Sequence, residues 1–301
     1  MRRTVRAQGR VAICASAALM WVPYVQAPHA PVFSTRVDLV AVDVVVTRPD
    51  GRPVTNLHAS DFQVLDQGLP QSAELIDASS IPLDLSLVLD TSGSTRNEGK
   101  HFWATIRTLA ALLRPDDRIG LVTFGRTVHQ MFALKPATAR IAEQPLWGGA
   151  GSPLIDALFD AIATPVQKGR RHVILAMTDG GDIGSVLGPD QLTAAAARSD
   201  AVMYVGLARH PDFRGIPFMA PALDRAVKDI CMSSGGAVLN SSGDDVVETF
   251  RRMVALLDHT YLLTYAPKNV PPEGWHTITV KVTKPGGDKY TVRARRGYFG
   301  G

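Results

Sequence analysis

Residues 83–95 read LDLSLVLDTSGST, a mostly apolar run that ends in an aspartate and a loop of small hydroxyl residues. An apolar run of this length, followed directly by turn-forming residues, is typical of a strand buried on both faces of a parallel sheet. Three similar runs follow along the chain, at residues 118–124, 173–177 and 202–207. Residues 83–95 therefore predict the first strand of an α/β sheet.

Helical patterns lie between these runs and after the last of them. Apolar residues recur at three- and four-residue spacing in the first interval, at Phe102, Ile106, Leu109, Ala110 and Leu113. Similar amphipathic stretches lie at residues 153–166, 189–199, 222–233 and 247–257. Strands that alternate with such helices predict a mostly parallel central sheet with helices on both faces, and we assign residues 81–258 to this domain.

The segments on either side, residues 31–80 and 259–301, read as β structure. Residues 277–283 alternate strictly between polar and apolar, and residues 290–295 do so again after a Pro-Gly-Gly-Asp turn. The first segment is rich in β-branched residues, which favour strands. Neither segment has enough strands to bury a core alone. We therefore expect the two to pair into one small β-sandwich, with the α/β domain inserted between its halves.

Residues 1–30 have the three parts of a secretory signal peptide: a basic start, an apolar run at residues 11–24, and small residues around Ala27 and Ala30. The pattern predicts a protein exported to the periplasm, the cell envelope or the medium. An uncleaved anchor at the membrane surface is the alternative interpretation. No later stretch reaches the roughly 18 apolar residues of a membrane span, so we expect no transmembrane segment in the mature chain.

Composition and charge narrow the function classes. The chain is 46% hydrophobic and 20% charged, which is ordinary for a globular protein. Its net charge of +4 comes from four arginines within residues 1–27, where there is no acidic residue, so the rest of the chain is formally neutral. Nucleic-acid binding is therefore not expected. Loss of the signal would also remove Cys14 and leave Cys231 without a disulfide partner.

Three loops at the ends of the predicted strands carry carboxylates and hydroxyls. They lie at residues 90–95, 148–154 and 178–182. Loops that follow the carboxyl ends of parallel strands line the ligand crevice of an α/β sheet. Hard oxygen donors of this kind suit Mg²⁺, Mn²⁺ or Ca²⁺ better than zinc or copper. These loops therefore predict a divalent-cation site at one edge of the sheet.

The motif Asp-x-Ser-x-Ser at Asp90, Ser92 and Ser94 resembles the metal-ion-dependent adhesion site of von Willebrand factor type A domains. The resemblance spans roughly residues 81–258 and implies a Rossmann-like fold. It also implies that two serines and a distal threonine give hydroxyl ligands, while two aspartates hold the metal directly or through water. By position, Ser152 takes the place of the threonine, keeping the hydroxyl and losing a methyl group, and Asp179 is the second aspartate. The implied ion is Mg²⁺, with Mn²⁺ or Ca²⁺ as alternatives.

The flanking β segments resemble those of bacterial secreted proteins described as VWFA-related. The likeness rests on the turn Gly-Arg-Pro-Val at residues 51–54 and on the tail Arg-Arg-Gly-Tyr at residues 295–298. It covers nearly the whole chain after the signal, and it agrees with the expectation of an exported protein.

These observations predict a secreted, divalent-cation-dependent, adhesion-type protein-binding module rather than an enzyme. Neutral hydroxyl ligands leave the ion electrophilic, so the Asp or Glu of a protein partner can complete an open coordination position through a charge-assisted contact. One alternative is a structural or assembly protein of the envelope in which the metal is a structural staple. Another is a hydrolase that uses the metal to activate water. The two serines of the first loop can also serve as helix caps.

Two common enzyme motifs are absent from the sequence. A phosphate-binding P-loop needs four residues between Gly and Gly-Lys-Ser/Thr, whereas five separate Gly93 from Gly99-Lys100, and His101 follows. No Gly-x-Ser-x-Gly nucleophile motif occurs either. No convincing general base accompanies the hydroxyls of the three loops.

Overall fold

The computed structural model describes residues 39–92, 99–146, 148–208, 221–241, 246–284, 286 and 289–300. The chain divides into residues 1–36 and a compact unit of residues 37–301, to which all of the described residues belong. The predicted signal peptide and the predicted ligand Ser94 lie outside the described residues. Among the described residues, no helix has the length and apolar character to cross a membrane.

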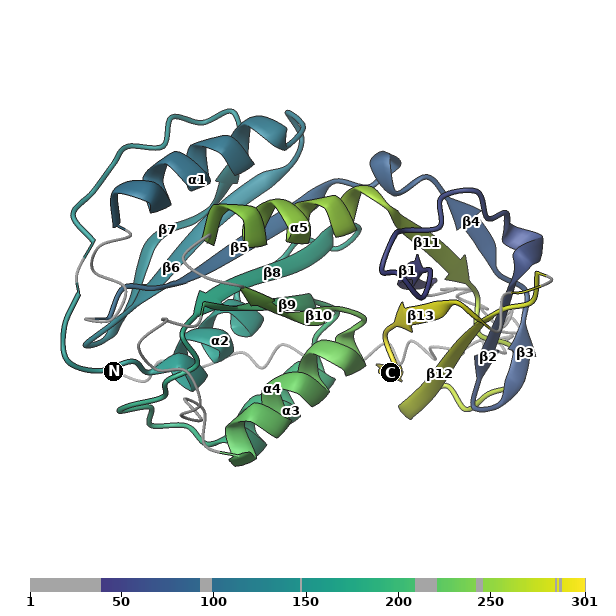
Figure 1. The fold of residues 1–301 in the computed structure, drawn as a ribbon. Helices are drawn as coiled ribbons and strands as arrows, with labels where there is room; N and C mark the ends of the chain where they lie inside the picture. Colours follow the sequence, from purple (N-terminus) through teal and green to yellow (C-terminus); the bar gives the residue numbers. More distant parts are fainter. Residues whose placement is uncertain are drawn as a thin grey trace, which may run out of the picture. The chain divides into compact units, whose positions relative to one another are not determined.

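The central sheet has six strands in the order β10-β9-β8-β5-β6-β7 (Figure 1). Their bounds are β5 (Leu83–Asp90), β6 (Arg118–Phe124), β7 (Val128–Pro136), β8 (Arg171–Thr178), β9 (Val202–Ala208) and β10 (Ala237–Ser241). Every pairing is parallel except that of β7 with β6. The strand that the apolar run at residues 83–89 predicts is β5, and all of its residues are buried at the middle of the sheet.

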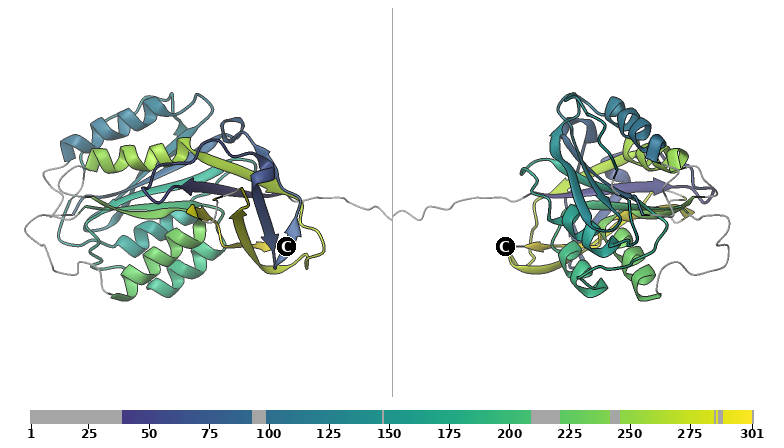
Figure 2. Two further views of the ribbon diagram at one scale, coloured as in Figure 1. Left: turned by 45° about the vertical axis from the view of Figure 1, so that its right-hand side comes forward. Right: turned by 90° about the vertical axis from the view of Figure 1, so that its left-hand side faces the viewer.

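Helices cover both faces of this sheet, as predicted (Figures 1 and 2). Their bounds are α1 (Gly99–Leu112), α2 (Leu154–Ala163), α3 (Pro189–Ala197), α4 (Pro221–Ser234) and α5 (Val246–Asp258). Helices α1 and α5 share one core with Leu85, Leu87 and Leu89 of β5. Helices α2, α3 and α4 share the other core with Val88, which points to the opposite face. Successive side chains of β5 point to opposite faces of the sheet, so this one strand contributes to two separate cores.

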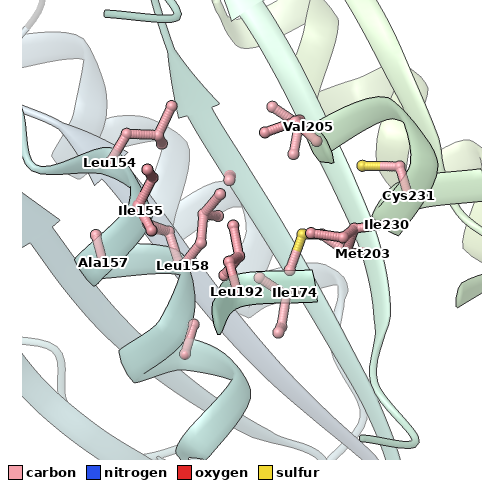
Figure 3. Packing of buried hydrophobic residues seen from close by; sticks show 14 of the residues in the cluster. Leu154, Ile155, Ala157, Leu158, Ile174, Leu192, Met203, Val205, Ile230 and Cys231 are labelled. Carbon is pink, nitrogen blue, oxygen red and sulfur yellow. The ribbon is translucent and has the colours of Figure 1, made fainter. Parts of the chain in front are cut away.

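The core beneath α2, α3 and α4 fixes the position of α2 on the sheet. Leu158, Leu192 and Ile230 come one from each of these helices (Figure 3). They share this core with Ile174 and Met203 of the sheet. Because the first residues of α2 are themselves buried here, the loop that precedes α2 is held at the edge of the sheet.

The two flanking segments form two four-stranded sheets, in the orders β13-β1-β11-β4 and β14-β12-β2-β3. The N-terminal strands are β1 (Val40–Thr47), β2 (Phe62–Asp66), β3 (Leu69–Gln71) and β4 (Glu74–Ile76). The C-terminal strands are β11 (Thr260–Tyr265), β12 (Gly274–Val282), β13 (Thr291–Ala294) and β14 (Gly297–Gly300). Strand β1 pairs antiparallel with β11 and β13, and β2 pairs with β12. Each sheet thus combines strands from both segments, which confirms the predicted β-sandwich.

A buried carboxylate connects four strands inside this sandwich. Asp66 of β2 accepts hydrogen bonds at 2.9 Å from the hydroxyls of Tyr265 in β11 and Tyr298 in β14. Its other oxygen lies 3.0 Å from Nδ1 of His276 in β12. Burial, together with the neighbouring Asp66, raises the pKa of both tyrosines well above the ordinary value. The Tyr of the Arg-Arg-Gly-Tyr tail therefore anchors the last strand to the core.

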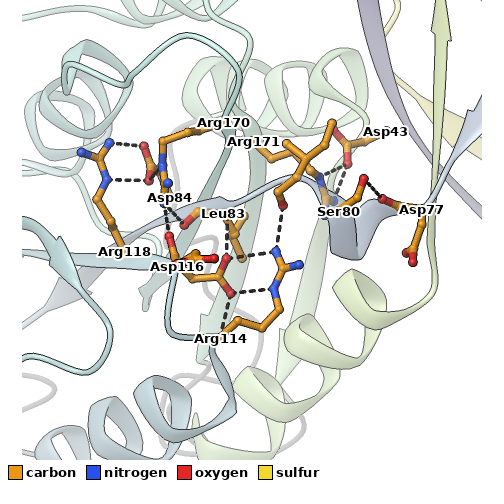
Figure 4. Close-up of polar contacts among 12 residues, drawn as sticks. Asp43, Asp77, Ser80, Leu83, Asp84, Arg114, Asp116, Arg118, Arg170 and Arg171 are labelled. Carbon is orange, nitrogen blue, oxygen red and sulfur yellow. Dashed lines mark hydrogen bonds and ion pairs between the residues drawn. The ribbon is translucent and has the colours of Figure 1, made fainter.

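A second polar network closes the end of the central sheet where β5 begins (Figure 4). Asp84 is fully buried and forms ion pairs with Arg118 and Arg170, the latter at 2.6 Å. Burial tends to raise the pKa of Asp84, but the two guanidinium groups outweigh burial and hold that pKa below its ordinary value. An ion pair between Arg171 of β8 and Asp43 of β1 joins the sheet to the sandwich. The opposite end of β5 carries the predicted metal ligands.

Candidate metal centre

The candidate centre begins where the neighbouring strands β5 and β8 end side by side. Their register pairs Leu89 with Met177, so Asp90 and Thr178 are the next residues on the two strands. The Thr178 hydroxyl donates a hydrogen bond of 2.9 Å to Oδ2 of Asp90. Asp90 is only 1% exposed. The parallel register therefore holds a buried carboxylate at the edge of the sheet.

The first loop turns back on Asp90. The backbone N–H of Ser92 donates to Oδ1 of Asp90 at 2.9 Å, and the Ser92 hydroxyl is also hydrogen-bonded to this carboxylate. The Thr91 hydroxyl donates to the carbonyl oxygen of Phe124 at 2.9 Å, which ties the loop to the end of β6. These bonds hold the Ser92 hydroxyl beside Asp90.

The second loop brings Ser152 to the same carboxylate. Its Oγ lies 3.4 Å from Oδ2 of Asp90 and donates to the carbonyl oxygen of Gly181 at 2.9 Å. Two backbone hydrogen bonds of 2.9 Å join Ser152 to Ile183. A side chain at Gly148 would place its Cβ 2.8 Å from the carbonyl oxygen of Thr91. Glycine at this position therefore permits the close approach of the first two loops.

The third loop supplies Asp179, immediately after β8. Its Oδ1 accepts a hydrogen bond of 2.9 Å from the backbone N–H of Gly181. Asp182, in the same loop, accepts bonds from the backbone N–H of Ile155 at 3.1 Å and from the Ser185 hydroxyl at 2.7 Å. Asp182 therefore braces the start of α2, whereas Asp179 belongs to the group around Asp90.

The electrostatics of the group fit a divalent cation. Burial raises the pKa of the Asp90 carboxyl above its ordinary value, and the negative charge of Asp179 adds to the rise. Hydrogen bonds from Ser92 and Thr178 oppose it. A cation beside both carboxylates would relieve the repulsion and compensate the desolvation. The residues present therefore suit a hard divalent ion.

Hydroxyl oxygens would complete the coordination of such an ion. Among the described residues, no group of three or more His, Cys, Asp or Glu side chains is arranged to hold a metal. A metal at this edge would therefore depend on serine and threonine oxygens beside the two carboxylates. Such oxygens are ligands that Mg²⁺, Mn²⁺ and Ca²⁺ accept.

Four of the five predicted ligands come together in the structure: Asp90, Ser92, Ser152 and Asp179. The fifth, Ser94, falls in residues 93–98, outside the described residues. Sequence reasoning missed Thr178, whose hydroxyl bonds to Asp90. Its position directly before Asp179, at the carboxyl end of a buried strand, was the available signal.

No family model matches the sequence, and no curated protein matches it. Among solved structures, the chain is similar to BatB from Bacteroides thetaiotaomicron, with 14% identity, 58% of this chain and 98% of that chain covered, and a TM-score of 0.42. It is also similar to the ArnB paralog VWA2 from Sulfolobus acidocaldarius, with 10% identity, 84% and 73% covered, and a TM-score of 0.45.

A further similar structure is proximal thread matrix protein 1 from the mussel byssus, described with a zinc-occupied MIDAS motif. The identity is 17% and the TM-score is 0.47. The match covers 66% of this chain and 51% of the mussel protein. Because these identities and TM-scores are low, the description of the fold rests on the strand order and the helix layers of the chain itself. By these it is a Rossmann-like α/β domain, with a mostly parallel central sheet and helices on both faces, flanked by a small β-sandwich.

Proposed function

We propose that this protein is an exported, divalent-cation-dependent module that binds another protein. The observation that supports this most directly is the convergence of Asp90, Ser92, Ser152 and Asp179 at the carboxyl edge of the sheet. In this proposal Asp90 and Asp179 balance the charge of the ion, Mg²⁺ in the first place, and the serine hydroxyls, with Ser94 as a third, complete its inner ligands.

The ion would recognise an acidic side chain of the partner. The two carboxylates balance the charge of the ion partly indirectly, by orienting the hydroxyls and waters that bind it. The ion therefore stays electrophilic, and one coordination position stays open. An Asp or Glu of the partner fills that position through a charge-assisted contact. No bond is broken in this process, so the proposal is a binding protein and not an enzyme. The signal-like pattern in residues 1–30 supports action in the periplasm, in the envelope or outside the cell.

A purely structural role for the metal is the weaker candidate. Direct hydrogen bonds already join the three loops: Ser152 to Ile183, Ser152 to Gly181, and Thr178 to Asp90. Loops that are held together in this way do not depend on an ion to keep their arrangement. A site that is preorganised in this way is better suited to binding a ligand through its metal than to needing the metal for its own stability.

Calorimetric titration of Mg²⁺ and Mn²⁺ into the purified protein tests the proposal. We expect saturable binding by the parent and none by Asp90→Asn, which keeps the shape of the side chain and removes its charge. In EDTA the midpoint of thermal unfolding should be no lower for Asp90→Asn than for the parent, because the variant no longer buries a charge beside Asp179. Only the parent should gain stability when metal is added.

The matched control is Asp190→Ala, which removes an exposed carboxylate in the first turn of α3, a group outside the centre. It should bind metal like the parent. A folded parent that binds neither ion would overturn the metal-dependent function and leave the three loops as a purely structural joint.

A further inference from the structure

A groove of about 560 Å³ lies beside the candidate metal centre. One wall is α2, the second is the turn between β6 and β7, and the third is the loop before α3. Pro153, which follows Ser152, and Gly184, which follows Ile183, both line it. Because Ser152 and Ile183 are joined by two backbone hydrogen bonds, one end of the groove lies next to Ser152 of the candidate centre. We call it the α2 groove.

The walls of the α2 groove carry apolar side chains that are open to solvent. Val128 and Phe159, both half-buried, line two of the walls, and Val186 forms part of the third. Val186 is 91% exposed, and the neighbouring Ile183 is 67% exposed. Exposed apolar residues grouped in a groove and bordered by charges are typical of an interaction surface.

Three charged groups line the groove, and two of them, Arg126 and Asp160, are of opposite sign and have no ion-pair partner within the described part of the chain. Arg126 lies at the metal end, where a Cβ added at Gly149 would be 2.8 Å from its Cβ. Asp160 lies two turns further along α2, and partial burial raises the pKa of its carboxyl. Asp156 differs, because its carboxylate accepts the backbone N–H groups of Val186 and Leu187 at 2.9 and 3.0 Å.

The spacing of these groups sets the length of a bound segment. Asp160 follows Pro153 by seven residues, which corresponds to about 10 Å along a helix. An extended peptide covers this distance in about three residues. A segment with its acidic residue at the metal would therefore bring a residue about three positions away to Asp160, and the side chains between them would meet the apolar walls.

We propose that the α2 groove binds an extended segment of the partner that carries an acidic residue for the metal and, about three residues away, a lysine or arginine for Asp160. This inference rests on the proposed function, since the metal contact places the segment. Arg126 lies near the acidic residue and adds to its attraction. The basic residue pairs with Asp160. An exposed ion pair contributes little to affinity, so the effect of this contact is mainly on specificity: it selects among segments that carry an acidic residue.

The test uses a displayed peptide library with one fixed Asp and five random residues on each side. Selection on the intact protein in Mn²⁺, with elution by EDTA, should enrich Lys and Arg about three positions from the fixed Asp, on one side of it. On Asp160→Lys, which has an exposed position on α2, the same selection should enrich Asp and Glu there instead. Asp190→Lys, the same change on the exposed face of α3, should select like the parent. A synthetic peptide of the enriched sequence should bind Asp160→Asn about fivefold more weakly than the parent.

The outcomes separate this inference from the proposed function. Metal-dependent peptides without a preference for a basic residue would overturn the α2 groove inference and leave the metal-dependent function standing. A basic preference that persists unchanged on Asp160→Lys would also overturn it. If a folded, metal-binding protein enriched no metal-dependent acidic peptide at all, both the inference and the proposed function would fall.

Discussion

Asp90 lies where three loops meet, and almost none of its surface reaches solvent. Its carboxylate accepts bonds from Ser92 and Thr178, and the charge of Asp179 lies close enough to raise its pKa further than burial alone does. Such an arrangement is unfavourable for an isolated negative charge and favourable for a cation ligand. Asp90 is therefore the residue at which stability without metal would conflict with the metal binding that we propose.

His172 shows the opposite use of burial, at the other end of the sheet. It is 5% exposed, and its Nε2 lies 3.0 Å from the Ser86 hydroxyl. Burial lowers its pKa from 6.5 to about 4, the nearby Asp84 opposes this change, and Arg118 adds to it. The ring therefore stays neutral in the folded protein at pH values where an unfolded chain would protonate it.

His172 should make the stability of the fold depend on pH. Between pH 6.5 and about 4 the unfolded state binds a proton at His172 that the folded state does not, so stability falls as the pH falls. We expect this residue to account for a loss of about 3 kcal/mol in the free energy of unfolding across that window. Urea unfolding at a series of pH values measures it.

His172→Gln keeps a hydrogen-bonding group and does not titrate, so the loss across this window should be smaller by that amount. His129→Gln alters an exposed histidine of β7 and should leave the pH profile unchanged. Equal slopes for His172→Gln and the parent would contradict the assignment. Asp84 and Asp117 have lowered pKa values, so the stability that they contribute is present above their ordinary value of 3.8 and is lost only as the pH falls below it.

Among the elements, the last strand has the most specific attachment. Strand β14 lies at the edge of its sheet and pairs only with β12 in the strand order. Tyr298 anchors it through the 2.9 Å bond to the buried carboxylate of Asp66. The Trp275 and Phe299 rings add an edge-to-face contact, with centroids 5.2 Å apart, between β12 and β14. This four-residue strand is thus held by side-chain contacts as much as by its backbone hydrogen bonds to β12.

Tyr298→Phe should destabilise the protein by about 2 kcal/mol, because it removes one hydrogen bond from a buried charged group without opening a cavity. Thermal or denaturant unfolding measures the change. Tyr290→Phe is the matched control: it removes a hydroxyl from a half-buried tyrosine of the same sandwich and should have almost no effect. A cost below 0.5 kcal/mol for Tyr298→Phe would show that Asp66 does not depend on this bond.

The sequence analysis missed two strands of the central sheet, β7 and the five-residue β10. Strand β7 lacks the apolar run that identified β5, β6, β8 and β9. Residues 128–136 read VHQMFALKP and are half-buried or exposed throughout. An antiparallel edge strand needs no continuous apolar run, since one side of its ladder is open. The same segment helps to form the α2 groove, which sequence reasoning also could not have located.

For the whole molecule, the main feature is that three cores are built from two non-overlapping sets of residues. The two cores of the α/β region draw on residues between 83 and 257, whereas the sandwich core draws on residues 40–75 and 261–298. The domain boundaries at residues 80 and 258 stay a prediction. Independent folding of residues 81–258 stays a prediction.

We therefore expect residues 81–258 to unfold cooperatively when expressed alone, because both of their cores remain complete. Residues 31–258 should expose unpaired strands, since β1 would lose both of its neighbours, β11 and β13. Limited proteolysis should cut this longer fragment within residues 40–76 and leave the full chain intact there, and the fragment should aggregate. Protection of residues 40–76 in the fragment would contradict the shared sandwich.

The sequence by itself determined the fold class and most of the candidate site. Apolar runs, helical spacing and period-two alternation are local properties. They identified four of the six central strands, the helices that cover the sheet, and both halves of the sandwich. The motif at Asp90 and the carboxylate after the 173–177 run were also recognisable, because strand ends in a parallel sheet meet at one edge.

Only the tertiary structure decided which groups touch. The bond from Thr178 to Asp90 depends on the register of β5 against β8, and the Asp66 network depends on strands about 200 residues apart. The α2 groove depends on three segments that share no pattern. Pairings of this kind follow from how distant elements pack, and no local period in the chain encodes them.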